Sequence, residues 1–241
     1  MEGTGKVVSL APLRHLVADH TGIQDISSGN QQDAIEFLTL LLELLPSEFS
    51  SFFDRHEQVS FKYFIYGQNV PCPNCGTFPH DKIELEKMIH LSIPNSNGAN
   101  LSQLLHNHYE YQINHDGKRC SNCCPHGDSK CPGTFKCVSM PLSEQRQINK
   151  FPQLLLIQIK RFQHDYIREY TSKIQTDVDI AESINIGGST YMLKGIINHM
   201  GTYDNRHYTL AVKRNGKWYL LDGFKQPQII SGREIYNGDT V

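Results

Sequence analysis

The sequence predicts an α+β protein from three observations: an amphipathic helix near the N-terminus, strand-type segments after it, and a cysteine-rich insert among those strands. The helix is predicted over residues 30–45, where apolar side chains recur at the i, i+3, i+4 and i+7 spacing of one helical face. From residue 58 onward, apolar residues alternate with polar ones, which is typical of strands. A leading helix followed by an extended sheet belongs to the α+β class.

The helix over residues 30–45 has recognisable ends. Ser27, Ser28 and Asn30 are suitable N-cap residues, because their side chains accept hydrogen bonds from the first backbone amides, and Pro46 ends the helix. The apolar face is wide, so we expect this helix to be buried on most sides. A shorter helix is predicted over residues 10–18.

The remaining elements are predicted from periodicity and turn residues. A short helix is expected over residues 101–108, capped by Asn100 or Ser102, and an irregular loop around a metal, or a flexible tip, over residues 120–137. Asn215-Gly216 is a tight-turn signal, so the two strands that flank it are predicted to be antiparallel neighbours. The predicted strands cover residues 59–63, 85–93, 154–162, 191–198, 208–213 and 217–221.

Composition excludes several classes of protein. The chain has 241 residues, of which 39% are hydrophobic and 20% charged, enough to form a core and unlike a disordered chain. Its net charge of −2 argues against a nucleic-acid-binding protein, which is usually strongly basic. No apolar run approaches the roughly 20 residues of a membrane helix, and no signal-type segment follows Met1. We therefore expect an intracellular protein of the cytoplasm or nucleus.

The seven cysteines predict a structural zinc site. They lie at positions 72, 75, 120, 123, 124, 131 and 137, and two pairs have Cys-x-x-Cys spacing: Cys72 with Cys75, and Cys120 with Cys123. Two such pairs supply the four thiolates of a tetrahedral Zn²⁺ site, which leaves no open position for catalysis. Cys124, Cys131, Cys137 and His126 stay open as alternative ligands.

A histidine and an aspartate at the ends of the predicted hairpin form a second candidate site. His207 begins one strand and Asp222 follows its partner, so the tight turn should bring their side chains together. A carboxylate that bonds an imidazole can orient it as a general base. By itself, a contact of this kind in a sheet is more often structural.

A third candidate is the polar segment Gln31-Gln32-Asp33 at the start of the long helix. Polar residues at this position usually cap the helix.

In this order, the segments resemble the catalytic domain of the ubiquitin-specific proteases, over about residues 20–235. The matching motifs are residues 31–38, the two Cys-x-x-Cys pairs, residues 151–162, residues 191–199, and His207-Tyr208 with residues 218–222. The resemblance implies a papain-like fold with a partial thumb, zinc-bearing fingers and an antiparallel palm sheet. It implies one domain over residues 1–241, with the thumb at 1–57, the fingers at 58–148 and the palm at 149–241.

The same resemblance implies a function and roles for four residues. It implies cleavage of the isopeptide bond after the ubiquitin C-terminus by a Cys-His-Asp/Asn triad. His207 matches the general base, and Asp222 matches the orienting residue. Asp33 matches the acidic residue that meets the basic ubiquitin tail, and Tyr208 lies beside the channel for the terminal glycines. The expected partner is ubiquitin, or a ubiquitin-like modifier, and its conjugates.

The chain departs from this family at the nucleophile. The family carries it in a box resembling Gly-Asn-Thr-Cys-Tyr, well before the Gln-Gln-Asp helix, whereas none of the 30 residues before Gln31 is cysteine. We therefore expect no hydrolysis by the chain as written. One hypothesis is a piece of an active cysteine-type deubiquitinase, and the alternative is an inactive pseudo-protease that binds ubiquitin or serves as a scaffold. A generic zinc-ribbon adaptor would leave the His–Asp hairpin unexplained.

Overall fold

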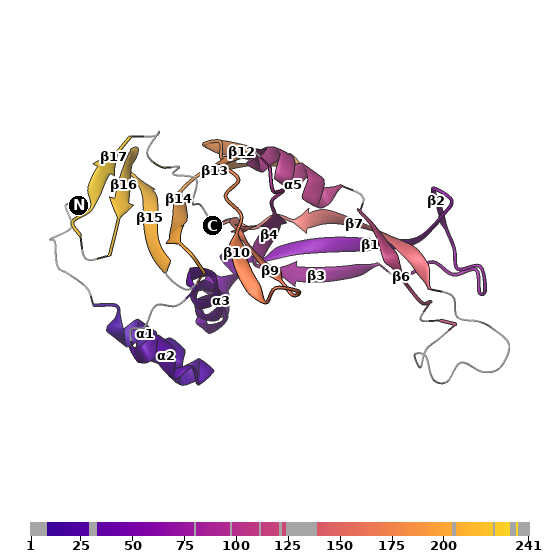
Figure 1. Ribbon diagram of the computed structural model, residues 1–241, viewed down its shortest axis with the longest axis horizontal. Helices are drawn as coiled ribbons and strands as arrows, with labels where there is room; N and C mark the ends of the chain where they lie inside the picture. Colours follow the sequence, from indigo (N-terminus) through magenta and orange to yellow (C-terminus); the bar gives the residue numbers. More distant parts are fainter. Residues whose placement is uncertain are drawn as a thin grey trace. The chain divides into compact units, whose positions relative to one another are not determined.

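The chain folds as two compact units in the computed structural model (Figure 1). Unit 1 comprises Met1–Phe52, His164–Lys173 and Gly195–Val241, and unit 2 comprises Phe53–Gln163 and Ile174–Lys194. The structure describes residues 9–28, 33–79, 81–96, 98–110, 112–120, 122–123, 139–203, 206–223, 225–231 and 235, with the backbone only at 114–118 and 206. The division into thumb, fingers and palm expected from the sequence stays a prediction.

Unit 1 begins with a small helical cluster. Val17, Ala18 and Ile26 form its buried centre, and half-buried apolar side chains of the third helix, Phe37 among them, pack against it. The helices are α1 (Ala11–Thr21), α2 (Gln24–Ser28), α3 (Ala34–Leu44) and α4 (Ser47–Ser50), and the 3₁₀ turn η1 (Ser51–Phe53) follows. Helix α1 ends at Gly22, whose φ of 74° is the left-handed conformation that glycine adopts without strain.

Helix α3 begins later than the sequence predicts, and it is capped by another residue. Asp33 is the N-cap, because its Oδ1 accepts hydrogen bonds from the amides of Ile35 (2.8 Å) and Glu36 (3.1 Å). Ser27 and Ser28 lie inside α2 instead, and Asn30 is outside the described residues. The expected burial on most sides is also wrong: Leu42 is the buried residue of α3, and its other apolar side chains are half-buried.

The second part of unit 1 is a four-stranded antiparallel sheet in the order β14-β15-β16-β17. Its strands are β14 (Gly195–Gly201), β15 (Arg206–Arg214), β16 (Lys217–Leu221) and β17 (Gln228–Ile230). Asn215 and Gly216 connect β15 to β16 with φ values of 48° and 75°. Two consecutive positive φ angles are the type I′ geometry of a two-residue hairpin, so the predicted turn is confirmed. Strand β10 (Tyr170–Lys173) also belongs to this unit and pairs with β9 (Phe162–Asp165).

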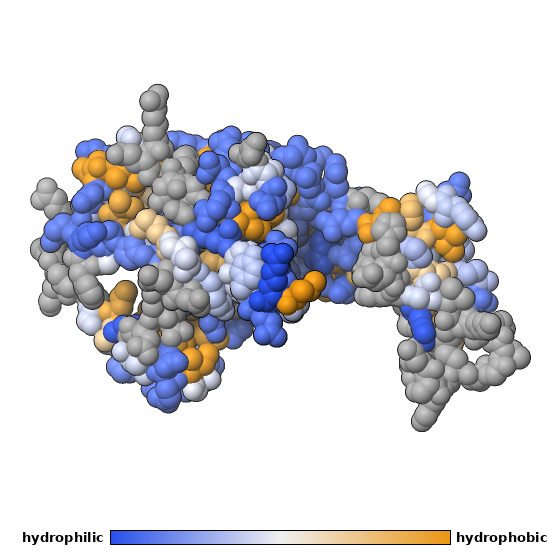
Figure 2. All heavy atoms as spheres, viewed as in Figure 1, coloured by the Kyte–Doolittle hydropathy of each residue, from blue (hydrophilic) through white to orange (hydrophobic). Residues whose placement is uncertain are grey.

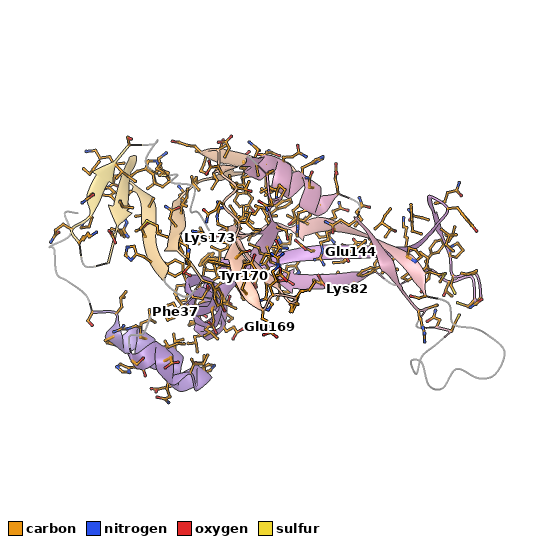
Figure 3. The ribbon with its side chains drawn as sticks, viewed as in Figure 1. Phe37, Lys82, Glu144, Glu169, Tyr170 and Lys173 are labelled. Atoms are coloured by element: carbon orange, nitrogen blue, oxygen red, sulfur yellow. The ribbon has the colours of Figure 1, made fainter. Side chains whose placement is uncertain are left out.

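Unit 2 is built on a long, twisted sheet with the order β2-β1-β7-β6 (Figure 1). Strands β2 and β3 pair with the same edge of β1, β3 at its start and β2 at its end. These strands are β1 (Arg55–Ile65), β2 (Gln68–Val70), β3 (Lys82–Glu86), β6 (Gln112–Lys118) and β7 (Met140–Lys150). Lys82 on β3 and Glu144 on β7 mark the two strands that flank β1 (Figure 3). Burial alternates along the first residues of β1, as expected for a strand that covers a core with one face.

Three small strand pairs and one helix complete unit 2. Helix α5 (Leu101–Tyr109) is capped by Asn100, whose Oδ1 accepts from the amides of Ser102 and Gln103, so the first of the two predicted caps is confirmed. The pairs are β4 (Met88–Ser92) with β8 (Leu156–Lys160), β5 (Ala99–Asn100) with β11 (Val178–Asp179), and β12 (Ser183–Ile186) with β13 (Ser189–Met192). The first two pairs are parallel.

Charged groups are buried between the long sheet and α5. Glu57 is fully buried, and its Oε1 accepts from Arg55 Nε (2.6 Å) and from the hydroxyl of Tyr109 (2.8 Å). Its Oε2 accepts from Arg146 Nη1 at 3.2 Å. Burial alone would raise the pKa of Glu57, but the charge of Arg55 and these hydrogen bonds outweigh it, so the pKa is lowered.

Three predicted strands are each split in two. Lys87 separates β3 from β4, Arg161 separates β8 from β9, and Leu193 with Lys194 separates β13 from β14. Arg161 itself is buried, and its Nη1 donates to the carbonyls of Ile174 (3.1 Å) and Thr176 (2.8 Å).

The predicted α+β class is confirmed. On the face seen in Figure 2, hydrophobic side chains form separate patches in a mostly hydrophilic surface. Separate exposed apolar residues, such as Tyr66 and Ile83, are normal for a folded domain. Among the helices that the structure describes, none has the length and hydropathy needed to cross a bilayer.

Candidate active site and metal centre

The hairpin of unit 1 brings His207 and Asp222 together. In the β15–β16 register, Leu210 is level with Leu221, so one further step would place residue 222 level with Thr209. His207 is two residues before Thr209 and therefore lies diagonally across from Asp222 on the same face of the sheet. The Asn215-Gly216 turn fixes this register, so the local sequence is sufficient to place the two side chains near one another.

The two side chains are in direct contact. His207 Nε2 lies 2.6 Å from Asp222 Oδ1, while the histidine side chain is 50% exposed and the carboxylate 18% exposed. When Nε2 carries the proton and donates it to Asp222, the lone pair is on Nδ1. The pair therefore presents Nδ1 as the ring nitrogen that can accept a proton from another group.

A lysine that no sequence motif indicated contacts the other oxygen of the carboxylate. Lys225 Nζ lies 2.5 Å from Asp222 Oδ2. The hydrogen bond from Lys225 first, and the one from His207 second, lower the pKa of Asp222 below its ordinary value. The sequence signal that could have indicated this contact is the position of Lys225, three residues after Asp222 at the end of a predicted strand.

Asp33 and Tyr208 are the second pair that unit 1 brings together. The Tyr208 hydroxyl donates to Asp33 Oδ2 at 3.2 Å, while Asp33 Oδ1 caps α3. Tyr208 is level with His199 on β14, and their rings meet edge to face at 5.0 Å between centroids. His199 is fully buried, so this contact fixes the ring of Tyr208 against the sheet. Gln31 and Gln32, the other residues of the predicted motif, lie outside the described residues.

Lys173 makes a further hydrogen bond between two elements of unit 1. It projects from β10 (Figure 3), and its Nζ donates to the carbonyl oxygen of His199 at 2.6 Å. The backbone of β14 beside the His199–Tyr208 contact is thereby held from a second element. This supports the position of Tyr208, the neighbour of His207 in the chain.

The four expected cysteines converge in unit 2. The sulfur atoms of Cys72, Cys75, Cys120 and Cys123 all lie within 4.8 Å of one another. Cys72 Sγ is 3.6 Å from Cys123 Sγ, and Cys75 Sγ is 3.6 Å from Cys120 Sγ. Tetrahedral zinc with bonds of about 2.3 Å requires sulfur atoms roughly 3.8 Å apart, so these four fit the ion.

The backbone and packing around the cysteines favour a fixed metal centre. The chain turns tightly from Cys72 to Gly76, whose amide donates to the carbonyl of Cys72 at 2.7 Å, and Cys75 lies in this turn. Tyr63, Met140 and Leu142 form a buried cluster with Cys72 and Cys120. These four cysteines form no disulfide. The alternative ligands Cys124, Cys131, Cys137 and His126 lie outside the described residues, and so does most of the predicted irregular loop.

Known proteins are similar to this chain, some of them over most of its length. The sequence profile of the ubiquitin carboxyl-terminal hydrolase family matches residues 13–229. "Ubiquitin carboxyl-terminal hydrolase 2" of Homo sapiens is 31% identical over 118 residues, which are 44% of this chain and 18% of that protein. "Ubiquitin carboxyl-terminal hydrolase Usp2" of Drosophila melanogaster is 25% identical over 252 residues, 90% of this chain and 26% of that protein.

Solved structures share the fold. The SAGA Ubp8/Sgf11/Sus1/Sgf73 DUB module bound to ubiquitin aldehyde matches with a TM-score of 0.68 at 20% identity, over 94% of this chain and 52% of that one. A structure of the yeast SAGA DUBm matches with a TM-score of 0.65 at 19% identity, over 89% of this chain and 50% of that one. The predicted fold is confirmed by these likenesses. The chain thus spans about half the length of these solved chains and a smaller share of the two curated relatives.

Proposed function

The chain belongs to the ubiquitin carboxyl-terminal hydrolase family, and from this premise we propose that it serves thiol-dependent deubiquitination as a ubiquitin-specific protease-type domain. The proposed reaction of the parent protein is hydrolysis of the isopeptide bond at the ubiquitin C-terminus. The observation that carries this proposal is the 2.6 Å contact between His207 Nε2 and Asp222 Oδ1. It leaves Nδ1 available as a base beside an exposed surface of unit 1.

In this proposal His207 accepts the proton of a thiol, and Asp222 orients the ring. A thiolate is a far better nucleophile than a thiol, so the base must face the sulfur with its lone pair. Asp222 holds Nε2 as the donor and stabilises the imidazolium that forms when Nδ1 takes the proton. The imidazolium then returns the proton to the amine that leaves.

The thiol itself is the missing component of the site. None of the residues assigned to unit 1 is a cysteine, and the described cysteines are the four that fit zinc. We propose that the parent protein supplies the nucleophile from a segment that is not in this sequence. The lack of a cysteine before Cys72 also favours a second candidate function, a catalytically inactive module that binds ubiquitin or acts as a scaffold.

Asp33 and Tyr208 are proposed to recognise the ubiquitin tail. The Asp33 carboxylate accepts from two backbone amides and from Tyr208, and it is the acidic group that would attract a basic tail. A basic tail that ends in two glycines would meet this charge and pass beside the ring of Tyr208. The hydrogen bond between the two residues keeps the acid and the aromatic ring together before the tail arrives.

The zinc site is proposed to be structural. Four cysteine ligands leave no position for water or substrate, so the ion would stabilise the turn regions of unit 2 without taking part in chemistry. Thiolates that bind zinc must stay reduced, which favours an intracellular location in the cytoplasm or nucleus.

Titration of isotopically labelled ubiquitin with the chain tests the proposal. We expect saturable NMR shift changes that include the C-terminal tail of ubiquitin, and several-fold weaker binding when the last tail residues are removed. Asp33→Asn should also weaken binding, because asparagine still caps α3 but carries no charge. Asp19→Asn, on the exposed side of α1, is the matched control.

Two results would count against this function. If ubiquitin shows no saturable shift at high micromolar concentration of the chain, the partner is wrong. If a ubiquitin-like modifier binds and ubiquitin does not, the same surface serves a related substrate.

A further inference from the structure

The carboxylate of Asp222 is held at both of its oxygens. Oδ1 contacts His207 Nε2 at 2.6 Å, and Oδ2 contacts Lys225 Nζ at 2.5 Å. The lysine comes from the turn that directly follows β16, in which its own amide donates to the carbonyl of Asp222 at 3.1 Å. Gly223 adopts a φ of 57° and lets the chain reverse within this turn. One short turn therefore carries both the acid and the cation that holds it.

We propose that Lys225 is a positioning residue for the His207–Asp222 pair, a role that rests on the proposed function of that pair. By fixing Oδ2, the ammonium group orients the carboxylate so that Oδ1 faces the imidazole. Lys225 then acts on the base through Asp222 and does not itself touch substrate.

The case for positioning follows from the surroundings of Asp222. The terminal torsion of an aspartate is broad, so one hydrogen bond does not fix the plane of its carboxylate. The histidine partner is half exposed and can also turn toward water. A second, charge-assisted bond on the other oxygen restricts the carboxylate to one plane. Lys225 is bound to Asp222 twice, through its backbone amide and through its side chain, so the turn itself keeps the ammonium group beside the carboxylate.

The exposure of Lys225 means that its contact with Asp222 should contribute little to the stability of the fold. The side chain of Lys225 is 68% exposed, and ion pairs at such positions contribute little to the free energy of unfolding. Its effect should instead be found in the orientation of the imidazole. With Asp222 fixed, the tautomer that carries the proton on Nε2 is favoured, and Nδ1 keeps the lone pair.

The tautomer can be measured directly in the intact chain. Long-range ¹H–¹⁵N NMR spectra of histidine-labelled protein distinguish the two neutral forms of the ring at alkaline pH. We expect His207 in the unmodified chain to be almost entirely in the Nε2–H form. In Lys225→Met, which keeps the aliphatic stem and removes the charge, the minor Nδ1–H population should rise several-fold toward its value in Asp222→Ala.

Two further variants separate positioning from a general effect of charge. Lys225→Arg retains a cation that can reach Oδ2, so it should restore the tautomer ratio of the unmodified chain. Lys217→Met removes an exposed cation at the far end of β16 and should change nothing. Backbone spectra of each variant establish that the hairpin is folded.

The outcomes distinguish this inference from the proposed function. An unchanged ratio in Lys225→Met, together with an altered ratio in Asp222→Ala, overturns the role of Lys225 and leaves the His–Asp pair intact. An unchanged ratio in Asp222→Ala shows that the carboxylate does not orient the ring, and it overturns the proposed base–orienter pair as well. If the His207 tautomer ratio changes in Lys225→Met and also stays changed in Lys225→Arg, positioning by the charge of residue 225 is overturned.

Discussion

The Tyr208 hydroxyl donates to Asp33 Oδ2 across 3.2 Å and joins strand β15 to the first turn of α3, although the two residues are 175 positions apart in the chain. The same aspartate caps α3 through its other oxygen. A single carboxylate therefore fixes where the helix begins and where it meets the sheet strand that carries His207. This hydrogen bond links the helical part of unit 1 to its sheet.

Removal of the Tyr208 hydroxyl should destabilise unit 1. We expect Tyr208→Phe to lower the free energy of unfolding by about 1 kcal/mol, the typical net value of one hydrogen bond. Tyr219→Phe, in a half-buried tyrosine of β16, is the matched control and should have a smaller effect. Urea unfolding followed by circular dichroism measures both. In an Asp33→Ser background, which keeps a capping oxygen but has no second polar atom for Tyr208, Tyr208→Phe should cost nearly nothing, and full additivity would disprove the link.

Zinc content should depend on four cysteines and no others. Cys120→Ser removes one of the four converging sulfur atoms, so the purified protein should lose most of its zinc and unfold at a lower temperature. Elemental analysis gives the metal content per chain. Cys137→Ser is the control, and we expect it to retain one zinc ion. Retention of zinc by Cys120→Ser, with loss from Cys137→Ser, would assign the ligands differently.

Unit 2 should be sensitive to acid because of Glu57. Its folded-state pKa is lowered, so its stabilising effect is present above the ordinary glutamate pKa and is lost as the pH falls through the folded value. Glu57→Gln should destabilise unit 2 by about 3 kcal/mol near neutral pH, because Arg55 would remain buried without its counter-charge. This difference should shrink in acid, as thermal unfolding at several pH values can measure. A difference that is constant with pH would mean that the charge of Glu57 is irrelevant.

Alanine substitutions at the adjacent residues Gly187 and Gly188 should distinguish the cost of a steric clash from the cost of backbone strain. Gly187 has a φ of 55°, and a Cβ added there would lie 2.6 Å from Phe151 Cζ, whereas Gly188 has a φ of 85° and open space around it. Both alanine variants should be destabilised by the left-handed backbone, by about 1 kcal/mol. Gly187→Ala should lose about 1–3 kcal/mol more, because the phenyl ring must move. Equal losses in thermal unfolding would exclude the clash.

Local signals allowed much of the hairpin site to be predicted. The Asn215-Gly216 turn fixes the register of β15 and β16, and the contact of His207 with Asp222 follows from that register alone. The two Cys-x-x-Cys pairs likewise predicted which four sulfur atoms converge. In both cases short-range chemistry determines the geometry, whereas the roles of these residues remain predictions.

Features that depend on tertiary contacts could not be predicted. The segment over residues 85–93 has one apolar pattern, yet it divides at Lys87, because β3 pairs antiparallel with β1 and β4 pairs parallel with β8. Strand β7 was missed, although it lies at the centre of the long sheet, because its central residues are mostly polar. The start of α3 was predicted too early, although capping by the polar segment that contains Asp33 was recognised; the contact of Asp33 with Tyr208 is one that no local pattern gives.

The most direct test is the reaction of the full natural protein with ubiquitin that carries a thiol-reactive electrophile at its C-terminus. We predict a covalent adduct, formed at least about 100-fold more slowly in His207→Ala, as expected when a general base is lost, and at an unchanged rate in the control His106→Ala on α5. The 241-residue chain alone should form none. No adduct with the natural protein would leave only the non-catalytic ubiquitin-binding function, and an unchanged rate in His207→Ala would contradict the proposed base.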